Sequence, residues 1–144
     1  MNYRRASAQD APLLAELNHQ LIRDEGHPNP MTLPELTQRM RQWLLTTYAG
    51  VLFEDERGII AYALYQEEAE GIYLRQFFVA RDRRRAGCGR RAMNILFSEI
   101  WPKNKRLTVS VLATNHPALA FWKAVGYTEY SLTLEIPPKN GRGA

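Results

Sequence analysis

Cysteine is the scarcest of the reactive residues in this chain, and its scarcity excludes two kinds of site. The 144 residues contain one cysteine, Cys88, so neither an internal disulfide nor a cysteine-based metal cluster can form. The chain also lacks an apolar run long enough to cross a bilayer. Polar Ser7, Gln9 and Asp10 stand where a signal peptide would have its apolar core. We therefore expect a cytoplasmic protein with no membrane partner and no metal.

Acidic residues are nearly absent from one stretch, residues 81–91. This stretch holds six arginines and a single acid, Asp82, and so carries +5 against a net charge of +4 for the whole chain. The rest of the chain is therefore close to neutral, at −1. A basic patch this compact suits a small polyanion better than a long nucleic-acid track, so we do not expect a nucleic-acid partner.

Internal repeats and low-complexity segments are missing too, and 45% of the residues are hydrophobic. We expect one domain over residues 1–144, with residues 137–144 as a flexible tail. Apolar spacing and turn signals predict helices near residues 10–25, 32–44, 89–100 and 117–125, and strands at 3–5, 71–80, 106–113 and 128–136, with two more within 48–68. This order indicates an α/β (α+β) domain with a mixed sheet.

Two glycines, Gly87 and Gly89, stand between the strand that ends at Val79 and the helix that follows. Free backbone amides at a helix N-terminus bind anions, most often phosphate. An ordinary turn with arginines for solubility is the simpler alternative. A Walker A loop is excluded because Arg90 stands where that loop needs lysine. A nicotinamide site is not expected, since a charged arm separates the strand from Gly87 and no acid ends the next strand.

The segment VARDRRRAGCGRRAM, residues 79–93, resembles the acetyl-coenzyme A loop of GNAT-superfamily N-acetyltransferases. The family core reads Arg/Gln-x-x-Gly-x-Gly/Ala, and Arg84, Gly87 and Gly89 occupy its places. The segment NHPALAFWKAVGY, residues 115–127, is similar to the family's second segment, Asn-x-x-Ala-x-x-Phe-Tyr-x-x-x-Gly-Phe. The resemblance covers residues 1–136. It implies a mixed sheet of six or seven strands with about four helices, and central strands that splay apart at the acetyl-coenzyme A (acetyl-CoA) site.

This resemblance implies acetyl-CoA as co-substrate and direct acetyl transfer to a primary amine of a small molecule or peptide. The backbone at Phe77, Phe78 and Val79 would pair with the pantetheine arm, and an amide at or beside Val79 would serve the oxyanion. Cys88 is expected to pack rather than react, and Asn115 also suits a helix N-cap. The remaining residues implied at the acetyl-CoA site are Arg84, Arg85, Ala86, Gly87, Cys88, Gly89 and Arg90 for the diphosphate, and Asn115, Ala118, Phe121 and Trp122 for the pantetheine.

The chain departs from the family at its catalytic positions. Trp122 stands where relatives carry the tyrosine that protonates the leaving thiolate, and an indole is no ordinary acid. Tyr73 and Ser110 stand where two branches carry a glutamate base. Glu25 and Tyr73 are the catalytic candidates, with His27 as a further base. Tyr73, Arg75 and Gln76 lie on the strand expected to face the acceptor, while Glu67, Glu68 and Glu70 are read as solvated loop charges.

Two alternative functions stay open. One is a coenzyme A-binding regulatory module that has lost efficient transfer, and the other is an RNA-facing acetyltransferase or binding protein that uses the arginines. The C-terminal region has room for one good strand, at 128–136, where the family usually finishes with two. An unpaired sheet edge invites association, so we expect a homodimer there.

Overall fold

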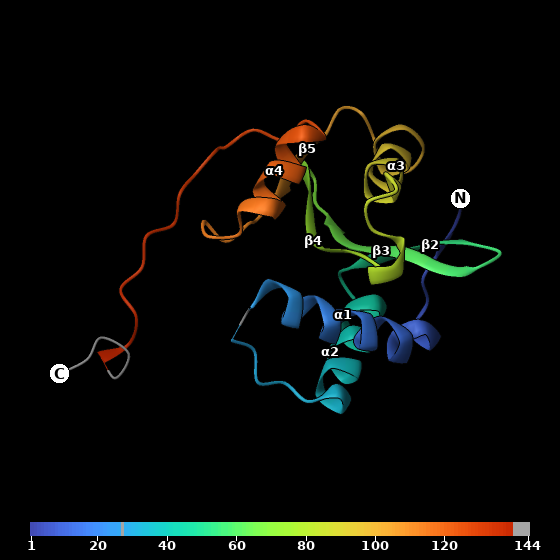
Figure 1. The fold of residues 1–144 in the computed structure, drawn as a ribbon, viewed down its shortest axis with the longest axis horizontal. Coiled ribbons are helices and arrows are strands. Elements are labelled where there is room, and N and C mark those ends of the chain that lie inside the picture. Colours follow the sequence, from blue (N-terminus) through green and yellow to red (C-terminus); the bar gives the residue numbers. More distant parts are fainter. Residues whose placement is uncertain (27, 140–144) are drawn as a thin grey trace.

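The computed structural model describes residues 1–26 and 28–139, and it contains a mixed five-stranded sheet covered on both faces by helices (Figure 1). The strands follow the order β1-β2-β3-β4-β5, antiparallel except for the parallel pair β4–β5. The elements are β1 (Asn2–Arg5), α1 (Ala11–Glu25), α2 (Leu33–Leu45), β2 (Ala49–Asp55), β3 (Gly58–Glu67), β4 (Gly71–Val79), α3 (Cys88–Ile95), β5 (Arg106–Val109) and α4 (His116–Ala124). The α+β class and the mixed sheet are confirmed.

Short-range hydrogen bonds set where the first helices begin and end. The Thr32 amide donates to Glu35 Oε1 at 2.8 Å and the Glu35 amide to Thr32 Oγ1 at 3.3 Å, a reciprocal capping box at the start of α2. Ser7 and Asp10 form the same arrangement at a single 3₁₀ turn, Ala8–Asp10, that leads into α1. Gly26, with φ +65°, ends α1 in the left-handed conformation that glycine adopts without strain.

The core is divided into two apolar layers by the sheet. Alternate residues of a strand point to opposite faces, so Ala63 and Tyr65 of β3 join the layer under α3 and α4, while Tyr62 and Leu64 join the layer under α1 and α2. Figure 1 shows this division, with α1 and α2 on one side of the sheet and α3 and α4 on the other. None of the described helices is long and apolar enough to cross a membrane.

The parallel pair β4–β5 is short, and this opens the middle of the sheet. Pairing runs only from Gly71 and Arg106 to Leu74 and Val109. β5 therefore ends four residues earlier than the expected 106–113. From Arg75 onward the outer edge of β4 has no strand partner within residues 1–26 and 28–139. The splayed central strands that the resemblance implied are present.

The expected strand at 128–136 is wrong for this structure. These residues form neither strand nor helix, so the described sheet has five strands and not six or seven. Figure 1 shows the segment running away from the body of the domain. Its alternating apolar residues have the preference for a strand, but a strand also needs a neighbour to hydrogen-bond, and no strand of the described residues pairs with it. Of the predicted tail, residues 140–144 lie outside the described residues.

Candidate active site

The loop between β4 and α3 is shaped by two left-handed residues. Arg85 has φ +66° and Gly87 has φ +74°. That conformation costs a residue with a side chain about 1–2 kcal/mol but is open to glycine. The first backbone bond of α3 runs from the Arg91 amide to the Gly87 carbonyl at 3.1 Å. The amides of the first turn precede that bond and have no helical carbonyl to bind, so they form an anion-binding end.

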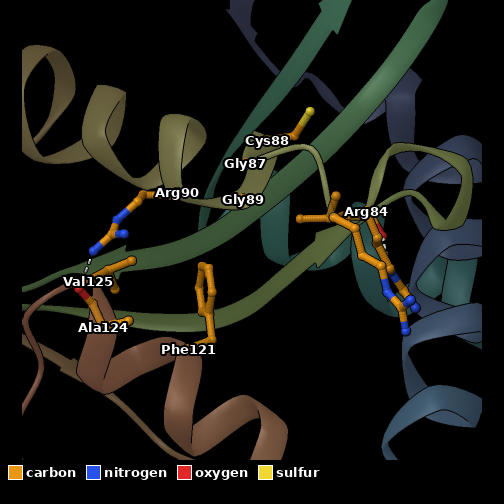
Figure 2. Close-up of a pocket in the computed structure, with 10 residues that line it drawn as sticks. Arg84, Gly87, Cys88, Gly89, Arg90, Phe121, Ala124 and Val125 are labelled. Atoms are coloured by element: carbon orange, nitrogen blue, oxygen red, sulfur yellow. Dashed lines mark hydrogen bonds between the residues drawn. The ribbon is translucent and has the colours of Figure 1, made fainter.

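Gly89 allows α3 to approach β4 and α4 closely. A Cβ at this position would lie 3.2 Å from Phe121 Cε1 and 3.3 Å from Val79 Cγ2. The three elements enclose an open cleft of about 360 Å³ (Figure 2). The cleft is lined by Val79, Arg84, Arg85, Gly87, Cys88, Gly89, Arg90, Phe121, Ala124 and Val125. The loop positions singled out in the sequence, Ala86 apart, therefore meet the end of β4 and one face of α4 in a single cleft.

Three of the loop's arginines are engaged by carboxylates of other elements. Arg81 and Arg84 both bind Asp24 near the end of α1, at 2.9 and 2.7 Å, and Arg84 Nε donates to the Val79 carbonyl at 2.9 Å. In Figure 2 the Arg84 side chain reaches away from α4 toward the helices on the other side. Buried Arg83 binds Asp55 with both terminal nitrogens, and this holds the pKa of Asp55 well below its usual range. These ion pairs fasten the loop.

Two other loop residues make contacts within the cleft walls. Arg90 Nη2 donates to the Ala124 carbonyl at 2.7 Å, across the cleft at the end of α4 (Figure 2). Cys88 is buried, its sulfur points away from Phe121, and it lies 3.5 Å from Arg91 Nη2. The placement of Cys88 fits the packing role expected of it.

The second segment of the resemblance forms the start of α4. Asn115 is the N-cap, and its Oδ1 accepts from the Ala118 amide at 3.2 Å. Phe121 follows one turn later and stacks on Phe77, with ring centroids 6.0 Å apart. The N-cap role of Asn115 is therefore present, and α4 presents Phe121 to the cleft.

Trp122 points into the core rather than into the cleft. Its indole packs edge-on against Phe121, Phe77 and Tyr127 at centroid distances of 5.0, 5.7 and 5.5 Å. The side chain is buried and is not one of the residues that line the cleft. Burial raises the pKa of the neighbouring Tyr127 well above its usual value. Neither side chain is thereby suited to give a proton to a leaving group.

The two catalytic candidates lie on different elements. Glu25 is the last residue of α1 and is exposed. Burial, and after it the charge of Glu25, raises the pKa of Tyr62 on the adjoining strand β3. Tyr73 lies in the paired part of β4, between Gln66 and Thr108. His27 lies outside the described residues.

On the α2 side of β4, Arg75 and Gln76 belong to a polar cluster whose other members were not predicted from the sequence. Buried Tyr62 donates to Gln76 Oε1 at 2.9 Å, and Arg75 Nη1 donates to the Tyr48 hydroxyl at 3.3 Å. The indole of Trp43 lies beside Arg75, with the guanidinium carbon 4.6 Å from the ring centroid. The signal was present, because Arg39 and Trp43 stand four residues apart and share one face of α2. The ion pairs of Asp24 had no local signal, since their partners lie about sixty residues away.

The comparisons with known proteins agree with this geometry. A model of the acetyltransferase (GNAT) family matches residues 14–127. A possible acetyltransferase from Clostridium difficile 630 has a TM-score of 0.77 at 18% identity, with 94% of this chain and 95% of that one covered. The aminoglycoside antibiotic 6'-N-acetyltransferase AAC(6')-IG of Acinetobacter haemolyticus has 0.75 at 18%, with 96% and 99% covered.

A third solved structure, a predicted acetyltransferase from Clostridium acetobutylicum with acetyl-CoA, has a TM-score of 0.72 at 20% identity, with 94% of this chain and 95% of that one covered. No curated protein matches the chain. At these identities the solved structures establish the fold, whereas the family model spans most of the chain and both segments of the site. The chain belongs to the GNAT family of acetyltransferases.

Proposed function

We propose that this protein transfers an acetyl group from acetyl-CoA directly to a primary amine of a small molecule or peptide. The observation that carries the proposal is the cleft at the N-terminus of α3. It combines a helix end with free amides and the unpaired edge of β4 beyond Leu74. A diphosphate suits the first feature, and an extended amide chain suits the second.

In this proposal the donor is held mainly by main-chain groups. The amides of residues 84–90 would bind the diphosphate, with Arg85 as an exposed arginine on the cleft wall. The backbone of Phe77, Phe78 and Val79 would pair with the pantetheine amides as an added strand would. Phe121 would form the apolar wall. Arg84 then holds the loop in place rather than binding the diphosphate, because its guanidinium forms an ion pair with Asp24.

The chemical step makes one C–N bond and breaks one C–S bond. The neutral amine attacks the thioester carbonyl carbon, the oxyanion is stabilised by the amide of Val79 or its neighbour, and the thiolate leaves. The amine nitrogen loses its proton to a base or to water. An amine of pKa near 10.4 is deprotonated in only about one molecule in 2,500 at pH 7, so forming the neutral amine costs roughly 4.6 kcal/mol. We propose that Glu25 and Tyr73 are the catalytic residues on the acceptor side of the reaction.

With Trp122 buried in the core, this mechanism assigns no tyrosine acid to the leaving group. The thiolate of coenzyme A would depart as an anion, stabilised by dipoles at the cleft. This step is consistent with the placement of Trp122 and does not need it to donate a proton.

The two alternatives make different use of the same residues. The ion pairs of Arg81, Arg83 and Arg84 favour a compact anion over RNA, because these charges are already neutralised within the fold. A coenzyme A-binding regulatory module would use the same cleft without turnover. We rank acetyl transfer first, the module second and RNA binding third, and we propose a cytoplasmic location.

Thermal denaturation with acetyl-CoA, followed by acetylation of a panel of amines, tests the proposal. At a hundred times its dissociation constant a ligand adds about 2.7 kcal/mol, which raises the Tm of a domain this size by roughly 5–10 °C. No shift at millimolar acetyl-CoA would contradict the proposal. A shift without release of coenzyme A across the panel would favour the regulatory module. RNA retention that coenzyme A does not displace would favour the RNA reading.

A further inference from the structure

Two arginines share one aromatic ring beside the open part of β4. The guanidinium carbons of Arg39 and Arg75 lie 4.4 and 4.6 Å from the ring centroid of Trp43. Arg75 also lies 5.8 Å from the ring centroid of Tyr48. A guanidinium that lies over a ring can still bind a planar anion through the N–H groups along the edge of its own plane. The pair therefore forms a cationic surface held in place by Trp43.

No carboxylate neutralises these two charges among the residues that the structure describes. None of the ion pairs recorded for residues 1–26 and 28–139 includes Arg39 or Arg75. Arg39 Nη2 donates to the neutral Asn18 Oδ1 at 3.2 Å, while its Nε is buried with no hydrogen-bond partner in the described part. Burial and then the charge of Arg75 lower the pKa of Arg39. An anion would relieve both the unpaired donor and the repulsion.

Space for a ligand lies beside the same ring. A cavity of about 430 Å³ is lined by Met31, Glu35, Gln38, Arg39, Gln42 and Trp43. The carboxylate of Glu35 is engaged in the helix cap, where it accepts from the Thr32 amide at 2.8 Å. The lining thus includes the Arg39 guanidinium, two amide side chains and the Trp43 indole, while Arg75 lies outside the lining and meets it through the Trp43 ring.

The position of Arg75 connects this surface to the donor site. Arg75 is the first residue of β4 beyond its pairing with β5, and it has no partner on β3 because a bulge leaves Leu74 and Gln76 as the paired residues. Bulges of this kind re-aim a side chain. Four residues of strand, about 13 Å, separate Arg75 from Val79 at the donor cleft. The surface therefore lies at the far end of the unpaired β4 edge, on the same strand as the thioester site proposed near Val79.

We propose that Arg39, Trp43 and Arg75 bind a carboxylate of the acceptor, so that the acceptors are small amines that carry a carboxylate, such as amino acids. This inference rests on the proposed function. The arginines would also disfavour a second positive charge nearby, which lowers the pKa of the acceptor amine and reduces the cost of freeing it.

Matched acceptor pairs test the proposal, each an amino acid and the amine left by its decarboxylation: lysine and cadaverine, histidine and histamine, tryptophan and tryptamine. Within a pair, we expect kcat/KM to be at least tenfold higher for the amino acid, which carries the carboxylate, than for the amine left by its decarboxylation. Arg75→Gln and Arg39→Gln should raise the KM for the amino acid about 10- to 100-fold, the loss of a charged hydrogen bond, with a smaller change in kcat. The control Arg41→Gln alters an exposed arginine of the same helix and should change neither.

Calorimetric binding of the same pairs, in the presence of coenzyme A, separates this inference from the proposed function. If no amine is acetylated but the amino acids bind more tightly than their decarboxylated partners, the transfer proposal fails and the carboxylate site stands. Three results would overturn the carboxylate site. They are equal affinity for both members of a pair, no binding at millimolar concentration, and an equal loss of affinity for both members in Arg75→Gln. Tighter binding of phosphoethanolamine than of any amino acid would overturn the carboxylate assignment in favour of phosphate.

A different observation carries a second inference. Tyr130, Leu132, Leu134 and Ile136 are 82%, 72%, 84% and 75% exposed. They alternate along residues 128–136 and so would share one face of a strand. The segment leaves the domain beyond α4 (Figure 1), and β5 is an edge strand of the described sheet. A strand with an apolar face and a sheet edge without a partner are complementary, yet in one copy the two are not paired as strands.

We infer that residues 128–136 of one copy pair with the β5 edge of a second copy, and the reverse, in a strand-exchanged dimer. Such exchange is closed by a two-fold axis, so two copies satisfy both edges. At the base of the segment, Tyr130 lies 4.3 Å from the Arg106 guanidinium and Glu129 binds Lys123 at 3.2 Å. These contacts direct the segment outward past its own β5.

Light scattering should give a dimer for the full chain, and a monomer for Leu132→Asp combined with Leu134→Asp. Thr133→Asp, on the opposite face of the segment, is the matched control and should stay dimeric. The double variant Ser110→Cys with Ser131→Cys, oxidised, should give a covalent dimer in a denaturing gel. The exchange would be overturned by a monomeric full chain or by a dimer that survives the two aspartates. It would also be overturned by a disulfide formed within one chain, which would mean that the segment folds back on its own β5.

Discussion

The cleft at Gly89 allows a sharp test of where the acyl donor binds. In Gly89→Ala the added methyl group would lie 3.2 Å from Phe121 and 3.3 Å from Val79, so the ring or the helix must shift by a few tenths of an ångström. Crowding of this kind costs about 1–3 kcal/mol, and alanine returns up to about 1 kcal/mol of helix propensity. We therefore expect the free energy of unfolding to fall by no more than about 3 kcal/mol.

Binding of the donor should suffer more, because both contacted side chains line the cleft. A loss of about 1–3 kcal/mol corresponds to a dissociation constant for acetyl-CoA raised roughly 5- to 150-fold. Calorimetry measures that constant, and urea denaturation measures stability. Asn94→Ala, on the exposed face of the same helix, is the control and should leave the constant unchanged. A Gly89→Ala protein that is folded and binds acetyl-CoA within twofold of the unaltered chain would refute the assignment of the cleft.

Three further predictions concern the contacts around the site. Asp24→Asn removes the carboxylate shared by Arg81 and Arg84. Because exposed ion pairs contribute little, the free energy of unfolding should fall by about 1 kcal/mol or less, while the KM for acetyl-CoA should rise. An unchanged KM would show that these ion pairs are not needed to hold the loop in place. Arg83 depresses the pKa of Asp55, so the stabilisation from this ion pair is complete above the unfolded carboxyl pKa near 3.9 and is lost as the pH falls below that value. Asp55→Asn should therefore make the free energy of unfolding fall less steeply with decreasing pH. An unaltered acid limb would count against the pair. Trp122→Phe should lower stability by about 1–3 kcal/mol through lost packing but keep kcat within threefold, whereas a hundredfold drop in kcat would place the indole in the chemistry.

Much of the fold follows from short-range patterns. The two capping boxes predicted the starts of the first helices, because each closes within three residues. The glycines of the loop and the Asn115 cap likewise act through neighbouring atoms. The sequence predicted a helix near residues 89–100, and the structure divides it into α3 and a π-helical turn, Leu96–Ile100. Hydrophobic spacing does not distinguish these two windings over so short a range.

The sequence by itself determined the element order as far as α4, the loop at the N-terminus of α3 and the two segments that mark the family, because each depends on spacing within a few residues. Tertiary structure alone decided the partners of Arg83 and Arg84, the burial of Trp122 and the meeting of Arg39 with Arg75 on one ring, since these contacts join residues far apart in the chain. It also decided that residues 128–136 stay unpaired. A strand is completed only by a neighbour, and local preference does not supply one.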